Sequence, residues 1–439
     1  MGRIGEEKVN MNILHVLQMS LPYTCGASIR SGYICKYQKE FAKVFVYTTF
    51  QYKSDKNMDI IDGIPYFRTN KNISFLLRFY MKLLLRVRKV ILKIFNIYLS
   101  SRILELPLSF FTKRYVKKII KIYDIDLIHQ YTQSSIGNYC LEVARKLNIP
   151  FIYSFRGFSE AGMLTAVNMR RLSDKKTTKF MYKKLKDDET NILKSADYVS
   201  TLSELMRNIL VKRGISKEKI LVIPNSVDHI LLKHENNRSL KEKLLLDDYL
   251  VIGHFGRLRA YEGIEILLKA LGILIYLGKK VKLIIVGDIE KKYLNYLNTV
   301  IEDEDLRNNI IFIERVSHTE IKNYYSIVDI IVIPRLNRYE CRMVTPLKPL
   351  DAMICKKLVI ASDLPALRYT ITPYVTGLLF KPGDPNDLAF KILEYINYPK
   401  MCRGLVNHAY NNVLQNFTWE FVVPKYEEVY SKLISEVKI

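Results

Sequence analysis

The feature that most constrains the fold is a regular alternation of short β-branched and aromatic runs with amphipathic stretches. It extends along most of the chain and restarts once. Strand repeatedly followed by helix predicts parallel sheets that are covered by helices on both faces. Strands are expected at 13–16, 44–47, 127–130, 151–155, 198–201 and 220–224, then at 250–255, 282–286, 310–314, 330–333 and 358–361, and helices at 136–147, 264–277, 321–327 and 389–396.

The restart of the pattern marks a domain boundary. Turn-forming residues at 224–228 precede a polar, charged stretch, and a new first strand begins at 250. We therefore predict an α/β fold with two Rossmann-like, doubly wound domains, 1–228 and 229–416, facing each other across a cleft. Residues 417–439 are expected to form one final helix. Open parallel sheets bind ligands outside the carboxyl ends of their strands, so candidate site residues should directly follow strands.

Positive charge is concentrated in the segment 71–121. This segment contains thirteen Lys or Arg residues and one acid, Glu105, so it carries half of the net charge of +24. Its basic residues at 78, 82, 86, 89 and 93 recur at helical spacing beside a wide apolar face, which favours an anionic membrane surface as the partner. An ordinary surface helix that packs on its own domain is the alternative. Specific nucleic-acid binding is not expected, because the chain has no recognisable nucleic-acid-binding motif.

The cysteines and the hydropathy pattern exclude several classes of protein. The six cysteines are far apart and none forms a Cys-x-x-Cys pair, which argues against a disulfide scaffold or a zinc site and is typical of a reducing cytosol. We expect no metal, no signal peptide and no membrane span.

In the second half, two loops after strands carry anion-binding chemistry. Gly256 and Arg257 follow the strand 250–255, and an arginine there offers a fork of donors to a phosphate. Thr345 and Lys348 lie in a Pro-rich loop that leads into a helix, where free backbone amides and the lysine charge favour an anion. Asp351, in the first turn of that helix, is expected to accept hydrogen bonds from a sugar hydroxyl.

In the first half, the loop around Gly26 joins the opening strand to a helix and is also suited to an oxyanion. Arg156 and Glu160 follow the strand 151–155, and we expect both to point toward the same cleft. Neither the Rossmann glycine fingerprint nor the P-loop motif is present, which disfavours nicotinamide enzymes and P-loop ATPases.

Taken together, these motifs resemble glycosyltransferase family 4 and its two-domain GT-B fold. The resemblance extends over nearly the whole chain and implies a retaining transferase that uses a nucleotide-diphospho-sugar as co-substrate, with no other cofactor and no protein-held metal. It also implies that Arg257 binds the donor diphosphate, that Asp351 binds the ribose and that the final helix crosses back to the first domain. The matching segments are the Gly26 loop, 224–228, 256–258, 346–353, 362–363, 376–380 and the helix containing Trp419.

Three positions depart from the family pattern. The usual lysine before the glycine of 261–263 is Glu262, the usual pair of glutamates corresponds to Met343 and Asp351, and the usual histidine after the strand 151–155 is Arg156. A departing nucleoside diphosphate still needs cationic stabilisation. We therefore predict that Lys348 takes over from the missing lysine.

Glu340 is the candidate to replace the lost first glutamate as a donor-sugar contact, which makes Arg156, Glu160 and Glu340 the candidate catalytic residues. This branch of the family is often tied to surface polysaccharide assembly. Together with the basic helix, the resemblance predicts a cytoplasmic enzyme, peripheral at the inner face of the cell membrane, that extends a lipid-linked glycan. A nucleotide-sugar epimerase on the same fold and a non-catalytic, nucleotide-sugar-binding assembly subunit are the alternatives.

Overall fold

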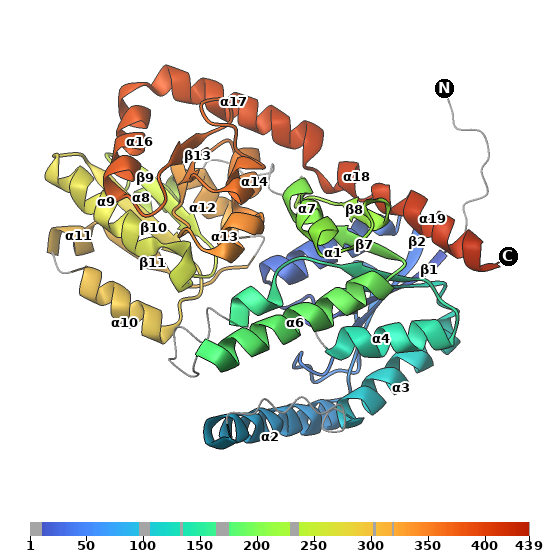
Figure 1. Cartoon of the computed structure of the whole chain (residues 1–439). Helices are drawn as coiled ribbons and strands as arrows, with labels where there is room; N and C mark the ends of the chain where they lie inside the picture. Colours follow the sequence, from blue (N-terminus) through green and yellow to red (C-terminus); the bar gives the residue numbers. More distant parts are fainter. Residues whose placement is uncertain are drawn as a thin grey trace, which may run out of the picture. The chain divides into compact units, whose positions relative to one another are not determined.

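The computed structural model describes residues 11–95, 106–131, 135–163, 175–228, 237–301, 304–317 and 320–438 of the chain. It divides into two compact units, each with its own sheet (Figure 1). Unit 1 comprises Met1–Pro224 together with Val423–Ile439, and unit 2 comprises Asn225–Val422. The α/β fold with two Rossmann-like sheets predicted from the sequence is confirmed.

Unit 1 is built on an eight-stranded sheet of order β3-β4-β2-β1-β5-β6-β7-β8, in which only the β3–β4 pair is antiparallel. The chain runs from β1 outward to β2 and later returns to β5 on the other side of β1, so the strand order reverses at β1. The strands are β1 Met11–Leu17, β2 Ala42–Thr48, β3 Met58–Ile61, β4 Ile64–Arg68, β5 Leu127–Gln130, β6 Phe151–Ser154, β7 Tyr198–Thr201 and β8 Ile220–Val222.

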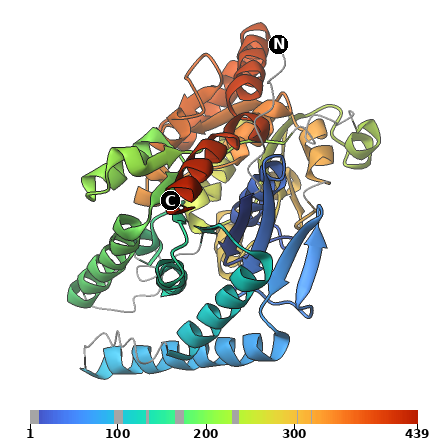
Figure 2. The same ribbon diagram turned by 90° about the vertical axis from the view of Figure 1, so that its right-hand side faces the viewer.

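The helices of unit 1 include two long basic ones, α2 and α3, at its border. Both views show α3 running from α2 toward the sheet (Figures 1 and 2). The last helix, α19, is anchored on the sheet by Tyr430, whose hydroxyl is 2.6 Å from His129 Nδ1. The helices are α1 Gly26–Gln38, α2 Lys71–Phe95, α3 Leu106–Tyr123, α4 Ser135–Lys146, α6 Lys175–Ser195, α7 Glu204–Lys212 and α19 Lys425–Lys438.

Unit 2 is built on a six-stranded, fully parallel sheet of order β11-β10-β9-β12-β13-β14. Here the strand order reverses between β9 and β12, which is where parallel α/β sheets bind their ligands. The strands are β9 Leu250–Phe255, β10 Val281–Val286, β11 Ile310–Ile313, β12 Ile330–Ile333, β13 Leu358–Ser362 and β14 Leu378–Phe380.

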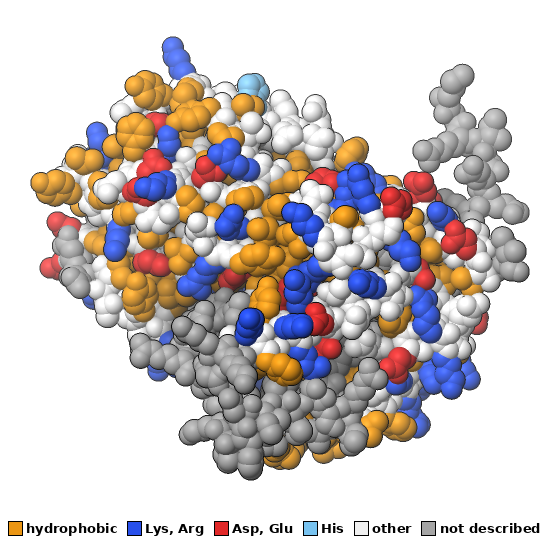
Figure 3. Space-filling model, viewed as in Figure 1, with side chains coloured by type: hydrophobic (Ala, Val, Ile, Leu, Met, Phe, Trp, Pro, Cys, Tyr) orange, Lys and Arg blue, Asp and Glu red, His pale blue; other side chains and the backbone are white. Residues whose placement is uncertain are grey.

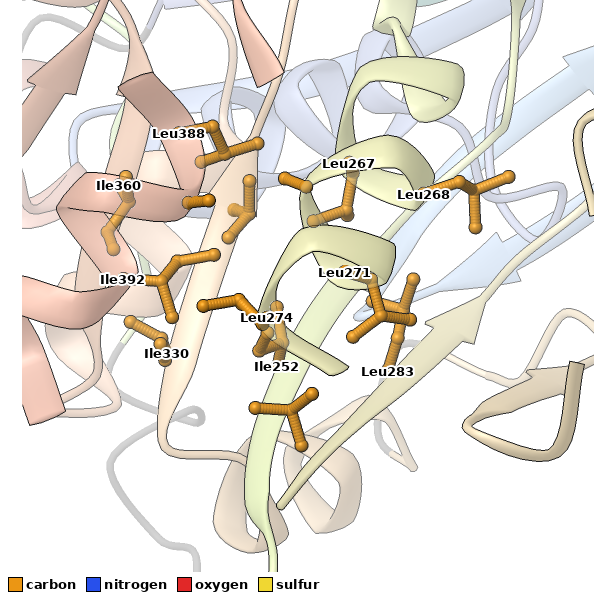
Figure 4. Close-up of a cluster of buried hydrophobic side chains, with 14 of the residues drawn as sticks. Ile252, Leu267, Leu268, Leu271, Leu274, Leu283, Ile330, Ile360, Leu388 and Ile392 are labelled. Atoms are coloured by element: carbon orange, nitrogen blue, oxygen red, sulfur yellow. The ribbon is translucent and has the colours of Figure 1, made fainter. Parts of the chain in front are cut away.

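Two apolar cores cover the two faces of this sheet. On one face, Leu267, Leu268, Leu271 and Leu274 of α9 belong to the same buried cluster as the sheet residues Ile252, Leu283 and Ile330 (Figure 4). Buried apolar area of this extent is the main stabilising term of the unit and fixes the strand ends that carry the site. The helices are α8 Arg238–Lys243, α9 Ile264–Tyr276, α10 Lys291–Val300, α11 Glu304–Asn308, α12 Ile321–Ile327, α13 Tyr339–Met343, α14 Lys348–Ile354, α15 Pro365–Arg368, α16 Pro385–Asn397, α17 Pro399–Asn416 and α18 Trp419–Val422.

One predicted element is wrong. Residues 417–439 do not form a single helix, because the chain breaks between α18 and α19 at Val423 and Pro424. Proline lacks a backbone N–H and its ring clashes with the preceding turn, so it ends one helix and precedes the next.

Candidate active site

Two loops meet at the switch point of the unit 2 sheet. One follows β9 and runs from Gly256 to Gly263, and the other follows β12. The Leu336 amide donates to the Tyr261 carbonyl at 3.0 Å, which joins the loops. Gly263 has a φ of +70°, and a Cβ there would lie 2.0 Å from the Pro334 carbonyl oxygen. Only glycine permits this approach, which brings the residue before it, Glu262, to the second loop.

Glu262 is the centre of a buried ionic cluster. Its Oε2 is 2.8 Å from Lys348 Nζ and its Oε1 is 3.3 Å from Arg335 Nη2, so each carboxylate oxygen contacts one cation. Burial opposes ionisation of Glu262, but the charges of Lys348 and Arg335 together outweigh it and lower the pKa of the carboxyl. The carboxylate is therefore ionised at neutral pH.

His254, on β9, completes the cluster. Its Nδ1 is 2.9 Å from the Val332 carbonyl oxygen, so Nδ1 must carry the proton, and its Nε2 accepts from Lys348 Nζ at 3.2 Å. Burial and the nearby Lys348 charge lower the pKa of His254 to about 3. With His254 neutral, the cluster holds two cations and one anion and carries one net positive charge.

Lys348 also explains the glycine that follows β9. Gly256 has a φ of +124°, and a Cβ at this position would lie 2.8 Å from Lys348 Cε. The lysine stem thus crosses the backbone directly before Arg257. The Arg257 side chain is about half exposed and makes a long ion pair of 3.7 Å with Glu290. Such surface pairs contribute little, so a phosphate can replace Glu290 at small cost.

The loop before α14 is tied to the start of unit 2. The Asn225 side chain donates to the Thr345 carbonyl oxygen at 2.7 Å. Asp351 lies one helical turn after Lys348, and burial raises the pKa of its carboxyl to about 7. Glu340 lies on the short helix α13, within the chain segment between Arg335 and Lys348.

Unit 1 brings the Gly26 loop and Arg156 together. Gly26 is the first residue of α1, and Arg156 follows β6. The Arg156 guanidinium donates to Ser31 Oγ at 2.8 Å and to the Ala27 carbonyl at 3.2 Å, and it lies 4.7 Å from the centre of the Tyr131 ring. Arg156 is therefore held against the first turns of α1.

Glu160 lies in a different environment. It is fully buried and forms an ion pair with Arg213, and Glu189 lies on the other side of that arginine at 3.9 Å. Burial and the nearby Glu160 charge raise the pKa of Glu189 to about 8, so Glu189 is mostly protonated at neutral pH. The contacts of Glu160 are thus separate from those of Arg156, and its catalytic role stays a prediction.

In the parts of the chain that the structure describes, no group of three or more His, Cys, Asp or Glu side chains is arranged to hold a metal ion.

Two family models that together match most of the chain define the class of protein, a glycosyltransferase that uses nucleotide sugars. Residues 36–230 match the family described as Glycosyltransferase Family 4, and residues 236–412 match Glycosyl transferases group 1. The chain belongs to this family. Retaining transfer without a protein-held metal is typical of its members, and the enzyme class predicted from the sequence is confirmed.

Individual relatives are distant. An uncharacterized glycosyltransferase of Methanocaldococcus jannaschii is 24% identical over 96% of this chain and 99% of its own length. The alpha-monoglucosyldiacylglycerol synthase of Streptococcus pneumoniae is 27% identical over 63% of this chain, and the match covers 60% of that relative. Among solved structures, Anabaena HepE in complex with UDP has a TM-score of 0.69 at 18% identity, covering 96% of this chain and 100% of that one, and it shows the same fold.

The structure thus brings together the lysine and the glycine loop that sequence reasoning singled out in unit 2. Sequence reasoning missed the partners of that lysine. Arg335 was visible as a cation directly after a strand, but His254 lies inside a strand and gave no signal. Glu262 was recognised only as the replacement for a lysine.

Proposed function

We propose that unit 2 binds the diphosphate of a nucleotide-diphospho-sugar through Lys348 and Arg257. The observation that carries this proposal is that the Lys348 stem crosses Gly256 at the switch point, beside Arg257, in a cluster with one net positive charge. A departing nucleoside diphosphate is multiply anionic, and fixed cations at that position stabilise it most in the transition state. Anabaena HepE, which has the same fold, binds UDP, which supports this class of donor.

The other predicted site residues take the roles that the family resemblance implies. Asp351 accepts a hydrogen bond from a ribose hydroxyl, and Thr345 lies in the loop that binds the donor. In unit 1, the loop that begins α1 at Gly26 and the adjacent Arg156 are the candidates for binding and catalysis, and in unit 2 Glu340 contacts the donor sugar. Together with Glu160 these residues are candidates for mutagenesis.

Donor binding is tested first by thermal shift with UDP-, ADP- and GDP-sugars, since a ligand that binds only the native state raises the melting temperature. Lys348→Met then keeps the stem over Gly256 and removes the charge. We expect it to slow release of nucleoside diphosphate from the donor by about 100-fold, the usual cost of losing one electrostatic stabiliser. Lys357→Ala is the matched control, because Lys357 is also partly buried but donates to the Ser326 carbonyl. Equal rates for Lys348→Met and the wild type would refute the proposed site.

We further propose that the acceptor is a lipid-linked glycan for surface polysaccharide and that α2 docks the enzyme on the anionic inner face of the cell membrane. Helix α2 has two apolar stripes. One contains Leu77 and Leu84, which are buried. A second stripe, at intervals of four, four, four and three residues, is exposed and consists of Phe75, Phe79, Leu83, Val87 and Val90. Packing on its own domain thus accounts for only one of the two stripes.

Basic side chains flank the exposed stripe. Lys82 and Arg86 are exposed, while Arg78 donates to the Tyr52 carbonyl at 3.3 Å. The side chains of Lys89 and Lys93 lie outside those that the structure describes. An apolar stripe beside exposed cations is the pattern of a helix that lies in an anionic membrane interface.

Among the helices that the structure describes, none is long and apolar enough to cross a membrane. On the face in Figure 3, Lys and Arg side chains are scattered over both units rather than gathered in one patch. The relative from Streptococcus pneumoniae is named as a synthase of a diacylglycerol glycolipid, which supports a lipid-linked acceptor.

A further inference from the structure

The Glu262 carboxylate contacts both cations that lie beside the proposed donor site. We propose that Glu262 is a positioning residue, which orients Lys348 and Arg335 so that their charges meet the departing diphosphate. This inference rests on the proposed function and assigns a role to a residue that itself does not touch the donor.

The geometry of Lys348 shows what the carboxylate achieves. A lysine ammonium has three N–H donors, and among the residues that the structure describes two of them are directed at Glu262 Oε2 and His254 Nε2. The third donor remains for a ligand, and 17% of the side chain is exposed. A free lysine samples many rotamers, so fixing two donors directs the third without further loss of entropy on binding.

Arg335 is fixed by the same carboxylate. Its Nη2 contacts Glu262 Oε1, and its Nη1 donates to the Val344 carbonyl at 3.2 Å. Glu262 itself is 3% exposed, and its two oxygens each hold one cation. Because Gly263 packs on the Pro334 carbonyl, the carboxylate is held between the β9 and β12 loops by the backbone.

The charge balance separates this role from two others. A carboxylate that only stabilised the fold would affect every ligand equally. A carboxylate that only shielded the cations would weaken diphosphate binding, and removing it would strengthen binding. If Glu262 is a positioning residue, removing its charge weakens diphosphate binding instead. Without the carboxylate, Lys348 is a buried cation beside Arg335 and loses both its orientation and its favourable partner.

The test compares a nucleoside diphosphate with its monophosphate. UDP, ADP and GDP are titrated into the full-length protein by calorimetry, and the tightest binder is kept with its monophosphate as the reference. We expect Glu262→Gln, which is nearly isosteric, to weaken binding of the diphosphate by about 10-fold or more and that of the monophosphate by less than about 2-fold, and to lower kcat more than it raises KM.

A double variant tests whether Glu262 acts on diphosphate binding through Lys348. In Lys348→Met, the added Glu262→Gln change should weaken diphosphate binding much less than it does in the wild type, because the two residues act together. Glu262→Asp keeps the charge, and we expect it to retain more diphosphate affinity than Glu262→Gln. It also serves as the test variant if Glu262→Gln does not fold.

Unchanged or tighter diphosphate binding in Glu262→Gln would overturn the positioning role, as would equal losses for the diphosphate and the monophosphate. For Glu262→Asp used alone, we expect a smaller loss that is again specific to the diphosphate, because the shorter side chain cannot reach both cations as well; tighter diphosphate binding, or equal losses for the diphosphate and the monophosphate, would overturn the role. If the wild type bound none of the three diphosphates, the proposed donor site itself would be refuted, and that result is distinct from a failure of Glu262 alone.

Discussion

The exposed stripe of α2 gives the sharpest test of membrane docking. Phe75 and Phe79 are 62% and 61% exposed, one helical turn apart on the same face. A phenylalanine buries about 200 Å² when fully covered, so the pair presents on the order of 250 Å². At about 25 cal/mol per Å², complete immersion would contribute about 6 kcal/mol.

A helix in the interface immerses its apolar face only in part, so we expect about half of that, or about 3 kcal/mol. The perturbation is the double variant Phe75→Gln/Phe79→Gln, since glutamine is polar and keeps a good helix propensity. Its partitioning onto vesicles of phosphatidylcholine with about 30% phosphatidylglycerol, measured by co-sedimentation, should fall by about 100-fold. Phe390→Gln is the matched control, because Phe390 is 56% exposed but lies on α16 of unit 2.

Salt separates the apolar contribution from the charge contribution. Lys82→Gln/Arg86→Gln should lose about 2 kcal/mol of vesicle binding at low ionic strength, about 1 kcal/mol for each residue. That loss should largely disappear at about 0.5 M salt, whereas the loss in the phenylalanine variant should persist. If the phenylalanine variant bound vesicles as tightly as the wild type, with its helix content unchanged by circular dichroism, the docking proposal would fail.

Two further predictions concern unit 2. Gly256→Ala places a Cβ 2.8 Å from Lys348 Cε at a φ of +124°, so we expect donor turnover to fall by about 10-fold or more in kinetic assays, whereas Gly272→Ala, with nothing within 4 Å, should leave turnover unchanged. Wild-type turnover in Gly256→Ala would show that the Lys348 position is unimportant. Asp351→Asn tests the raised pKa of the Asp351 carboxyl. Because the folded-state pKa is about 7, above the ordinary value, the stability that this group contributes is fully present below about pH 4 and is lost as pH rises through 7. Asp351 keeps some solvent exposure, so we expect the variant to be about 2 kcal/mol more stable than the wild type at pH 8 and nearly equal at pH 4 in urea denaturation. A constant difference across this range would contradict the raised pKa.

Much of the fold could be predicted from the sequence because the buried strands are continuous apolar runs. Each predicted strand overlaps an observed one, from β1 to β13, and the predicted helices correspond to α4, α9, α12 and α16. The antiparallel pair β3–β4 was missed, since both strands are short and burial alternates along each of them instead of forming a continuous buried run. The two stripes of α2 could not be separated either, because periodicity places apolar residues on faces without showing which face the domain covers.

The ionic cluster shows where sequence reasoning stops. Glu262 and Lys348 are 86 residues apart and belong to different loops, so from the sequence each could be assessed only by itself. By itself, Glu262 indicates that a cation of the family pattern has been lost, and Lys348 indicates that another has been added. The structure shows that the two form one unit, because the order of β9 and β12 in the sheet places the loops that follow them side by side, and a glycine lets the backbones approach. A negative residue at a position expected to be positive therefore still leaves the site cationic, since the carboxylate holds two cations and leaves one net positive charge beside Gly256 and Arg257.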